Sequence, residues 1–423
     1  MVSIDEALRF TLEAISVLEP VEVKLNEALG GVLAETVNAD DDVPPFANSS
    51  MDGFALQSVD TQRAPVTLRV VDTAFAGRPS SRTLAAGEAI RIMTGAVLPA
   101  GADAVCMVER TRASSDGATV VIEEAVAPGQ FVRSAGDDLR RGAEVFIAGE
   151  VLGPAHVGVL ASLGRTVVRV RPRPRVGVLS TGDELIDGGG ALVAGMIHDS
   201  NRHVLLGLVR SSGFDAVDLG IVPDDRDRLR QSLRDAALTC DAVLTSGGVS
   251  VGDADLVKEV LVEECGDTMR SMSVAVRPAK PFAFGILKDS ATPVFGLPGN
   301  PVSSLVSFEL FARPALRQMA GYATIFRPVI IAVCDEALRR DVDGKVHVVS
   351  VRATIEDDGR VHVRTAGVQA SHVLSSMARA NALSIVPDGT GVECGGCVET
   401  MLVEPASLGG VSAVLSSQVS VEA

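Results

Sequence analysis

Apolar runs alternate with segments of helical spacing through the central part of the chain. Residues 176–179 and 242–245 have the length and composition of buried strands, whereas residues 229–237 place apolar side chains at helical intervals. Strands that alternate with helices are typical of a parallel sheet covered on both faces. The pattern predicts a doubly wound α/β domain at residues 171–325.

The segments on either side have different patterns. Residues 3–18 carry apolar side chains on one helical face, and residues 46–131 contain short alternating runs that indicate strands. After residue 326, short strands are separated by Asp-Gly and Gly-rich turns, as in a small β barrel. The prediction is a multidomain α/β plus β protein: a discontinuous N-terminal scaffold domain (1–45 and 132–170), an inserted β domain (46–131), the α/β domain (171–325) and a C-terminal β barrel with a tail (326–423).

The composition restricts the kind of partner. The chain of 423 residues has a formal net charge of −16, no Trp and one Tyr, which argues against nucleic acid as the main partner. No apolar stretch approaches the roughly 18 to 20 residues that cross a bilayer, and the first residues lack the features of a signal peptide. We therefore expect a cytoplasmic protein that binds neither nucleic acid nor membrane.

The six cysteines are scattered along the chain, as expected for reduced core residues. Cys394 and Cys397 have the spacing of a redox or zinc pair, but no second Cys or His pair lies near them in the sequence to complete a zinc site. The two glycines between them favour a hairpin turn instead.

The loop after the apolar run at 242–245 has the composition of a phosphate and metal site. Paired glycines let the backbone turn sharply and bring its N–H groups close to a ligand, and nearby hydroxyls add donors. Asp253 and Asp255 have a spacing that places one carboxylate on a divalent cation, although Asp253 suits a helix cap equally well. The candidate ligand-binding residues of this loop are Ser246, Gly247, Gly248, Ser250 and Gly252.

Two further loops, FGLPGNPVSS and STGDEL, follow apolar runs with related chemistry. The first combines free N–H groups at a helix start with hydroxyls, which suits an anion, but an ordinary helix with Pro at its first position explains it equally well. The second suits either carboxylate chemistry or a helix cap. Three such loops in one α/β unit favour a shared site at the carboxyl ends of the strands. The candidates are Pro298, Gly299, Asn300 and Ser303 in the first loop, and Thr181, Gly182, Asp183 and Glu184 in the second.

Eight motifs, in order along nearly the whole chain, resemble those of the MoeA family of molybdopterin molybdenumtransferases, which includes the E domain of gephyrin. Together they are far more specific than any single loop. The motifs are VPPFANSSMDGFA from Val43, RIMTGAVLPAGADAV from Arg91, RSAGDDLRRG from Arg133, PRVGVLSTGDEL from Pro174, DSN from Asp199, TSGGVSVGDAD from Thr245, RPAKPFAFG from Arg277 and GLPGNPVSS from Gly296.

The resemblance implies the last step of molybdenum cofactor assembly. In that step adenylylated molybdopterin and molybdate give the molybdenum cofactor and AMP, with a divalent metal such as Mg²⁺. Cleavage of a phosphoanhydride requires neutralised phosphates and an oxygen nucleophile placed in line. We assign Glu184 and Asp255 as metal ligands or proton-transfer groups, with Asp183 and Asp225 in support.

An acidic protein that binds anions requires local positive charge. The nearest candidates to the predicted site are Arg202, Lys258, Arg277 and Lys280. We assign Arg277 and Lys280 to molybdate or phosphate, the arginine in bidentate fashion. The resemblance adds Arg352 and Ser376 of the C-terminal domain as weaker candidates for holding molybdate.

The resemblance also implies a functional role for Asp52 and Thr94. From the sequence alone, Asp52 would be interpreted as part of a turn and Thr94 as a cap at the end of a strand. In the family, matching residues affect activity, and one chain's β domain faces the α/β domain of another. We therefore expect a homodimer with a site shared between chains. The adenylyltransferase that makes the substrate and molybdoenzyme chaperones are further expected partners.

The chain departs from the family pattern before the FAFG segment. Family members commonly read K-x-x-x-K-P-G-K-P, whereas this chain has Ser273, Arg277, Ala279 and Lys280. One anchoring cation is lost and another has a different geometry. A paralogue with reduced activity, or one that handles tungstate, remains an alternative.

Two other functions have some support. The adenylyltransferase that makes the substrate resembles the α/β domain, but its usual loop is closer to G-G-T-G, whereas this chain has Gly247-Gly248-Val249-Ser250. A non-catalytic scaffold would resemble the animal relative that anchors receptors. The loop and the additional domains favour molybdenum insertion over both.

Overall fold

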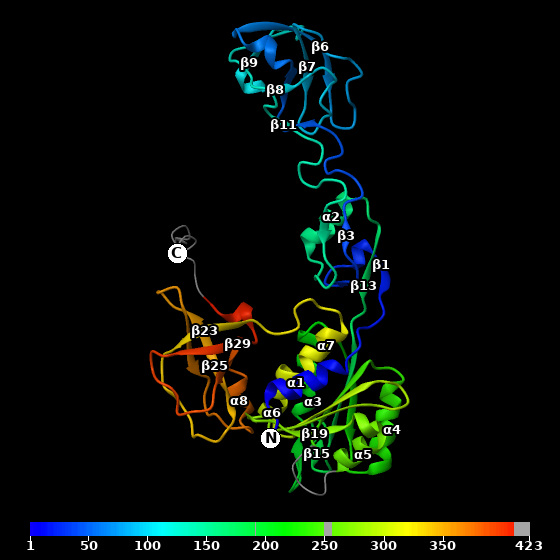
Figure 1. Cartoon of the computed structure of the whole chain (residues 1–423), viewed down its shortest axis with the longest axis vertical. Helices are drawn as coiled ribbons and strands as arrows, with labels where there is room; N and C mark the ends of the chain where they lie inside the picture. Colours follow the sequence, from blue (N-terminus) through cyan, green and yellow to red (C-terminus); the bar gives the residue numbers. More distant parts are fainter. Residues whose placement is uncertain (191, 249–255, 410–423) are drawn as a thin grey trace. The chain divides into compact units, whose positions relative to one another are not determined.

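The computed structural model describes residues 1–190, 192–248 and 256–409 (Figure 1). The chain forms two compact units: unit 1 comprises residues 1–21 and the chain from Arg171 onward, and unit 2 comprises Glu22–Val170. The expected scaffold domain included all of residues 1–45, but α1 (Ile4–Glu13) packs on the core of unit 1, where the Phe10 ring lies 5.9 Å from that of Phe284. In the described part of the chain, no helix is long and apolar enough to cross a membrane.

The core of unit 1 is a six-stranded sheet in the order β17-β14-β18-β22-β21-β19. The first four strands are parallel, β21 pairs with β22 in antiparallel fashion, and β19 pairs with β21 in antiparallel fashion. Residues of β18 are buried on both faces, which is why this segment is a continuous apolar run. The strands are β14 (Arg175–Thr181), β17 (Asp215–Val222), β18 (Ala242–Ser246), β19 (Arg270–Ser273), β21 (Pro281–Ile286) and β22 (Pro293–Leu297).

Helices cover both faces of this sheet, as predicted for a doubly wound domain. One face packs against α1, α3 and the continuous helix α6–η5–α7, and the other packs against α4 and α5. The long helix contains a π turn at Phe308–Ala312, just before Pro314, which has no N–H for a regular helical bond. The helices are α3 (Asn201–Ser211), α4 (Arg226–Ala237), α5 (Leu256–Cys265), α6 (Pro301–Ser307) and α7 (Arg313–Met319).

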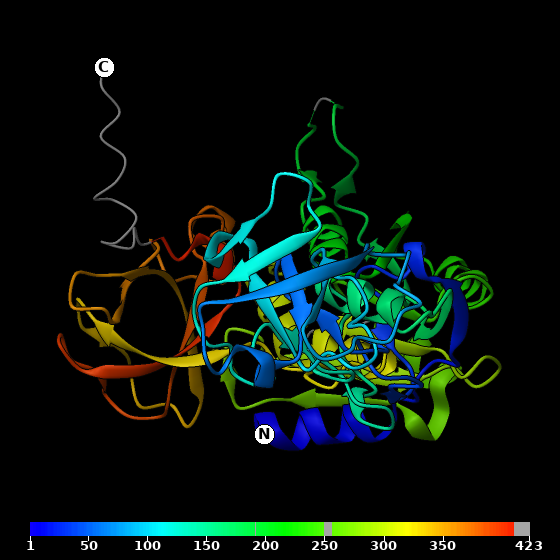
Figure 2. The same cartoon turned by 90° about the horizontal axis from the view of Figure 1, so that it is seen from above.

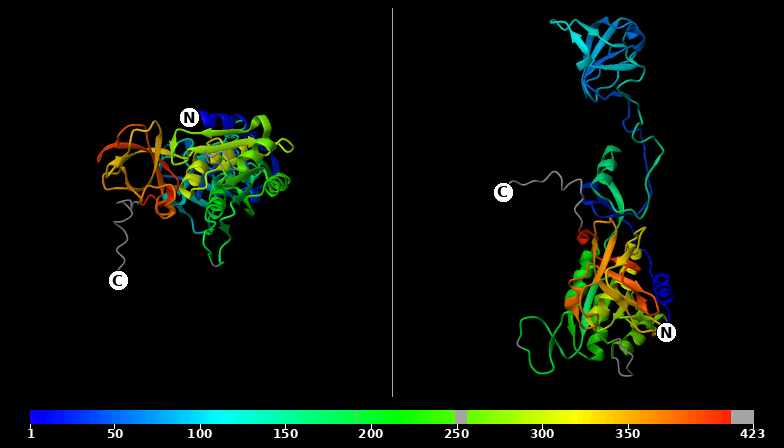
Figure 3. Two further views of the ribbon diagram at one scale, coloured as in Figure 1. Left: turned by 90° about the horizontal axis from the view of Figure 1, so that it is seen from below. Right: turned by 90° about the vertical axis from the view of Figure 1, so that its left-hand side faces the viewer.

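The C-terminal region of unit 1 is a closed barrel of five strands, in the order β25-β26-β23-β29-β27, because β27 pairs back with β25. Its ring of strands is visible in Figure 2 and in the left view of Figure 3. The short strand β20 joins β25 in parallel and so connects the barrel to the α/β domain. The elements are β20 (Val276–Arg277), β23 (Val329–Cys334), β24 (Leu338–Arg339), β25 (Val346–Ile355), β26 (Val361–Thr365), α8 (Leu374–Met377), β27 (Ala382–Val386), β28 (Gly391–Val392) and β29 (Cys397–Leu402).

Unit 2 contains a six-stranded sheet, β8-β5-β7-β6-β10-β9, and a smaller group of strands. In that group β13 lies between β1 and β2, and β12 pairs with β3, so segments at both ends of the unit build it together. The elements are β1 (Val21–Lys24), β2 (Val32–Leu33), β3 (Val37–Asn38), β4 (Asn48–Ser49), β5 (Gly53–Leu56), β6 (Val66–Ala74), β7 (Glu88–Ile92), β8 (Ala104–Met107), β9 (Thr111–Ala113), β10 (Thr119–Ile122), β11 (Val132–Arg133), β12 (Glu144–Phe146), α2 (Pro154–Ser162) and β13 (Val167–Arg171).

Candidate functional site

The central sheet changes direction between β14 and β18. The chain leaves β14 through α3 to β17 on one side, and then returns through α4 to β18 on the other side. Ligands of doubly wound sheets bind beyond the carboxyl ends of such a strand pair. Ser246, the last residue of β18, pairs with Ser180 of β14 and with Leu297 of β22. The three predicted loops therefore start at one edge of the sheet, and we call residues 181–184, 246–248 and 298–300 the strand-end loops.

Asn201, the first residue of α3, ties two of the strand-end loops together. Its side-chain amide donates to Oγ of Ser246 at 2.8 Å and to the carbonyl oxygen of Gly299 at 2.6 Å. Gly247 has a φ of 97°, and a Cβ at this residue would lie 3.0 Å from the carbonyl oxygen of Thr181. The close approach of the loops after β14 and β18 therefore requires glycine at this position.

The loop after β14 presents two carboxylates. Asp183 and Glu184 are both exposed, and Oδ1 of Asp183 accepts the backbone N–H of Asp224 at 3.0 Å. Gly182 has a φ of 146°, and a Cβ there would collide with the carboxylate of Glu184. The Glu184 carboxylate thus lies against the backbone turn, open to solvent and to a ligand.

Two residues that were predicted for the site instead form contacts that stabilise the fold. Asp225 caps α4, because its Oδ1 accepts the backbone N–H of Arg228 at 2.8 Å. The side chain of Arg202 is 3% exposed and is not available to an incoming anion. Its guanidinium group donates to the carboxylates of Asp187, Asp199 and Asp218.

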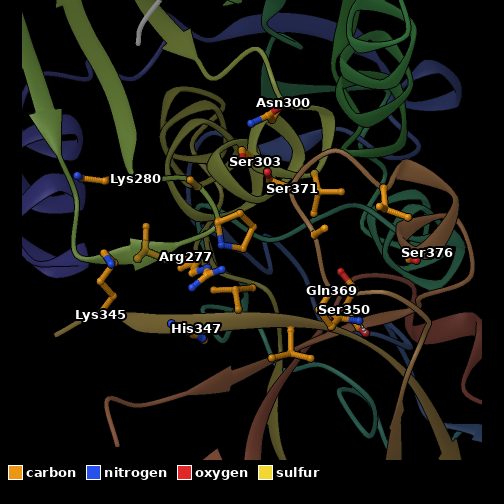
Figure 4. A pocket seen from close by; sticks show the side chains of 18 of the residues that line it. Arg277, Lys280, Asn300, Ser303, Lys345, His347, Ser350, Gln369, Ser371 and Ser376 are labelled. Atoms are coloured by element: carbon orange, nitrogen blue, oxygen red, sulfur yellow. Dashed lines mark hydrogen bonds between the residues drawn. The ribbon is translucent and has the colours of Figure 1, made fainter. Parts of the chain in front are cut away.

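A cavity of about 490 Å³ lies between the α/β domain and the barrel, within unit 1 (Figure 4). This volume is typical of small-molecule sites. Cationic side chains line one end, and hydroxyl and amide groups line the other. The first group is Arg277, Lys280 and Lys345, beside His347; the second is Ser350, Gln369, Ser371 and Ser376, while Asn300 and Ser303 line the cavity from the loop between β22 and α6.

The cations of this cavity come from two elements. Arg277 and His347 are register partners in the β20–β25 pair, and Lys280 follows in the same turn as Arg277. Within the described residues, neither Arg277 nor Lys280 forms an ion pair with a carboxylate. Ala279 between them is buried and has a φ of 87°, an uncommon conformation for a residue with a Cβ.

Asp343, which does not line the cavity, contacts two side chains that do. Its Oδ2 lies 2.7 Å from Nζ of Lys345, and its Oδ1 lies 3.2 Å from Nε2 of His347. The hydrogen bond from Lys345 and that of His347 lower the pKa of Asp343 to about 2. The carboxyl group is therefore ionised at neutral pH, and it compensates part of the positive charge at this end of the cavity.

Asp52 and Thr94 lie together in unit 2, and both are exposed. Oδ1 of Asp52 accepts the backbone N–H and the hydroxyl of Thr94, each at 2.7 Å. These two hydrogen bonds hold the pKa of Asp52 below its ordinary value. The structure brings the predicted pair together, and its catalytic role stays a prediction.

The predicted residues of unit 1 divide between the strand-end loops and the cavity, whereas Asp52 and Thr94 lie in unit 2. Arg277, Lys280 and Ser376 line the cavity, but Arg352 is exposed on β25 and is not among the cavity residues. Ser250, Gly252, Asp253 and Asp255 lie outside the described residues. Among residues 1–190, 192–248 and 256–409, no three His, Cys, Asp or Glu side chains are grouped as metal ligands. The metal pair of Glu184 and Asp255 therefore stays a prediction.

Sequence reasoning did not select several residues that the fold places at these sites. Asn201 was noted only as part of the DSN motif. Its position at the start of a helix was the one feature of the sequence that could have indicated its role. The cavity residues of the barrel carry no local motif, because they come from the start of β25, the turn before it and the segment before α8. They are Lys345, His347, Ser350, Gln369 and Ser371.

Three protein-family models match the chain: the MoeA N-terminal region (domains I and II) at residues 2–164, a probable molybdopterin binding domain at 177–318 and the MoeA C-terminal region (domain IV) at 339–403. The molybdopterin molybdenumtransferase of Haemophilus influenzae is 36% identical over 407 residues, which cover 96% of this chain and 98% of the relative. The chain belongs to the MoeA family. The resemblance seen in the sequence is therefore confirmed.

Other members of the MoeA family also match over nearly the whole chain. Molybdopterin molybdenumtransferase 2 of Mycobacterium tuberculosis (strain H37Rv) is 37% identical over 396 residues, covering 92% of this chain and 96% of the relative. A crystal structure of the molybdopterin biosynthesis MoeA protein from Pyrococcus horikoshii OT3 matches with a TM-score of 0.80 at 29% identity, covering 95% of this chain and all of that one. The predicted architecture, an α/β domain with a β barrel in a multidomain chain, is confirmed.

Proposed function

We propose that this MoeA-family protein is a molybdopterin molybdenumtransferase. In this proposal it takes adenylylated molybdopterin and molybdate and releases molybdenum cofactor and AMP. Similarity to enzymes of that name over more than nine-tenths of the chain supports the proposal. The structural observation that carries it is the loop between β22 and α6, where Gly299 accepts from Asn201 beside Ser246, while Asn300 lines the cationic cavity. One loop thus borders a phosphate-binding turn and an anion cavity.

The chemistry requires an oxygen nucleophile to attack phosphorus in line while a P–O bond of the phosphoanhydride breaks. In this proposal the phosphates bind at the glycine turn at 247–248 and at the start of α6, through groups other than the backbone N–H groups of Gly247 and Val302, which donate to the carbonyl oxygens of Leu297 and Ser371. Glu184 is exposed, and in this proposal its carboxylate either accepts the proton of the nucleophile or binds the metal. Arg277 and Lys280, which have no carboxylate partner in the described part of the chain, suit the molybdate dianion.

Mg²⁺ fits the donor type of this site. It prefers one or two carboxylates and completes its shell with water and substrate oxygens. The exposed carboxylate of Glu184, held against Gly182, fits this role, together with the proposed ligand Asp255 outside the described residues. When bound, Mg²⁺ would supply neutralisation of the phosphate charge.

The test is AMP release from adenylylated molybdopterin by the purified protein with Mg²⁺, in the presence of no oxyanion, molybdate or tungstate. We expect molybdate-dependent release, a product that activates an apo-molybdoenzyme, and loss of release with EDTA. Release with tungstate but not molybdate would indicate the tungsten paralogue. No release under any condition would contradict the transferase proposal and favour a scaffold.

The remaining expectations are part of the same proposal. We propose a cytoplasmic homodimer in which Asp52 and Thr94 contribute to catalysis. Light scattering coupled to size exclusion should then give about twice the chain mass of 43.9 kDa. A monomer with full activity would contradict a site that needs two chains.

A further inference from the structure

The cationic end of the cavity has a charge imbalance that a ligand would remove. Arg277, Lys280 and Lys345 line it, and the carboxylate of Asp343 pairs with Lys345. Three cations and one carboxylate leave two net positive charges. Arg340 and Asp388, further from the cavity, pair with each other at 2.7 Å and cancel. The local charge therefore matches a dianion.

We propose that Lys345 is an anion-binding residue of this cavity, and that the carboxylate of Asp343 limits the positive charge of the cavity and thereby its affinity for a tetrahedral dianion. The identification of that dianion as molybdate or tungstate rests on the proposed function. Neither residue belongs to one of the motifs, so sequence reasoning did not select them.

The geometry of Lys345 supports this role. An ammonium group has three N–H donors, and one of them points to Oδ2 of Asp343 at 2.7 Å. The side chain is 20% exposed, and it lines the cavity next to the register pair Arg277 and His347. The turn before β25 thus adds a cation from the barrel to the two from the α/β domain, as the labelled side chains show (Figure 4).

The carboxylate behind Lys345 is firmly held. The guanidinium group of Arg340 is 2% exposed and donates to Oδ1 of Asp343 at 2.8 Å and to the carbonyl oxygen of Lys345 at 2.6 Å. Groups fixed before a ligand arrives need little reorganisation when it binds. Lys345 can therefore bind an anion while it remains paired with Asp343.

The experiment measures the dissociation constants of molybdate and of perrhenate, a tetrahedral monoanion, by calorimetry on the full chain. Lys345→Ala should weaken molybdate binding about tenfold, because a charge-assisted hydrogen bond is lost. Lys345→Arg should retain most of the affinity. The matched control is Arg339→Ala, which removes a cation that is 78% exposed on the same domain, and it should bind as the wild type does.

Asp343→Asn is the more discriminating variant. A role through charge predicts stronger molybdate binding, whereas a purely structural role predicts weaker binding. The amide keeps the shape of the side chain but removes a negative charge, so molybdate affinity should rise severalfold. The affinity for perrhenate, which has half the charge, should rise less, so the preference for molybdate should increase. A purely structural role for Asp343 predicts weaker binding of both anions. Circular dichroism and the melting temperature establish that each variant is folded.

The outcomes separate this inference from the proposed function. If the wild type binds molybdate and Lys345→Ala binds it equally well, or if Asp343→Asn weakens binding, the inference fails even where AMP release is molybdate-dependent. If Lys345→Ala loses affinity while the wild type releases no AMP, the inference stands and the transferase proposal fails. Binding of neither anion by the folded wild type would overturn the inference by itself.

Discussion

The strand-end loops and the cavity beside the barrel are built in different ways. Each strand-end loop is one short segment in which glycines, hydroxyls and carboxylates follow a buried strand. The cavity instead takes its side chains from residues 276–281, 300–303, 345–350 and 368–376. The first site is formed largely by the path of the backbone, and the second by charged side chains on separate elements.

This difference predicts different sensitivities. The strand-end loops approach so closely that an added Cβ meets backbone, as at Gly247, whereas the cavity is open enough to tolerate changes of side-chain size. We therefore expect the loops to respond to changes of shape and the cavity to changes of charge.

Gly247→Ala should have the largest effect on the strand-end loops. The new Cβ would sit 3.0 Å from the carbonyl oxygen of Thr181 and would force an alanine to adopt a φ of 97°. The conformational strain costs about 1–2 kcal/mol of stability. A shift of the loop by about 1 Å is enough to lower kcat/KM for AMP release roughly 100-fold.

Gly207→Ala is the control for this substitution. Gly207 lies in α3 of the same domain, a Cβ there would meet no atom within 4 Å, and the change should stabilise the helix by about 0.5–1 kcal/mol. Equal activity in the two variants would show that the close approach of the loops has no role in the reaction. Molybdate affinity measured on Gly247→Ala should stay within about twofold of wild type if the cavity binds anions independently.

The same contrast explains how much of the site the sequence could predict. Residues of the strand-end loops were predicted because a buried strand followed by glycine is a local signal, and the order of the strands then brought three such loops to one edge. Lys345 and His347 carry no such signal, since only the β20–β25 pairing brings them to Arg277. Arg352, suggested by resemblance, is exposed on the same strand, whereas Ser350 lines the cavity.

The fold shows the same division between local and long-range information. The α/β domain and the barrel followed from hydrophobic spacing, because each strand and helix carries its own pattern. The pattern at residues 3–18 predicted a helix but not its location. Its attachment to unit 1 depends on contacts such as that of Phe10 with Phe284, which no local pattern encodes.

Asn201→Ala should have an intermediate effect. It removes the two hydrogen bonds to Ser246 and Gly299, each with a net contribution of about 0.5–1.5 kcal/mol. The two loops lose a connection but keep their backbone shape, so kcat/KM should fall about tenfold, less than for Gly247→Ala. Ser211→Ala, at the other end of α3, removes only an exposed bond to the carbonyl of Leu208 and should change neither activity nor stability by a measurable amount.

His362→Gln should have a smaller effect, on the stability of the barrel and not on anion binding in the cavity. Its ring nitrogens bond Asp335 at 2.6 Å and Asp358 at 3.2 Å, and these bonds raise the pKa of His362. The resulting stabilisation is present below the ordinary pKa of histidine and is lost as pH rises through the raised value. From about pH 6 to about pH 8.5, the melting temperature of the wild type should fall more than that of His362→Gln. Because His362 does not line the cavity, molybdate affinity at fixed pH should be the same in both proteins.

Ala279→Gly should have the smallest effect, and it tests whether the shape of the turn matters to the cavity at all. Ala279 adopts a φ of 87° between Arg277 and Lys280. The left-handed conformation costs alanine about 1–2 kcal/mol, and the greater freedom of glycine in the unfolded chain offsets about 0.4–1 kcal/mol of the relief. Thermal unfolding should therefore show a net stabilisation of about 1 kcal/mol or less. Since both cations are retained, molybdate affinity should change less than twofold, and a larger change would mean that backbone shape controls the cavity as it controls the strand-end loops.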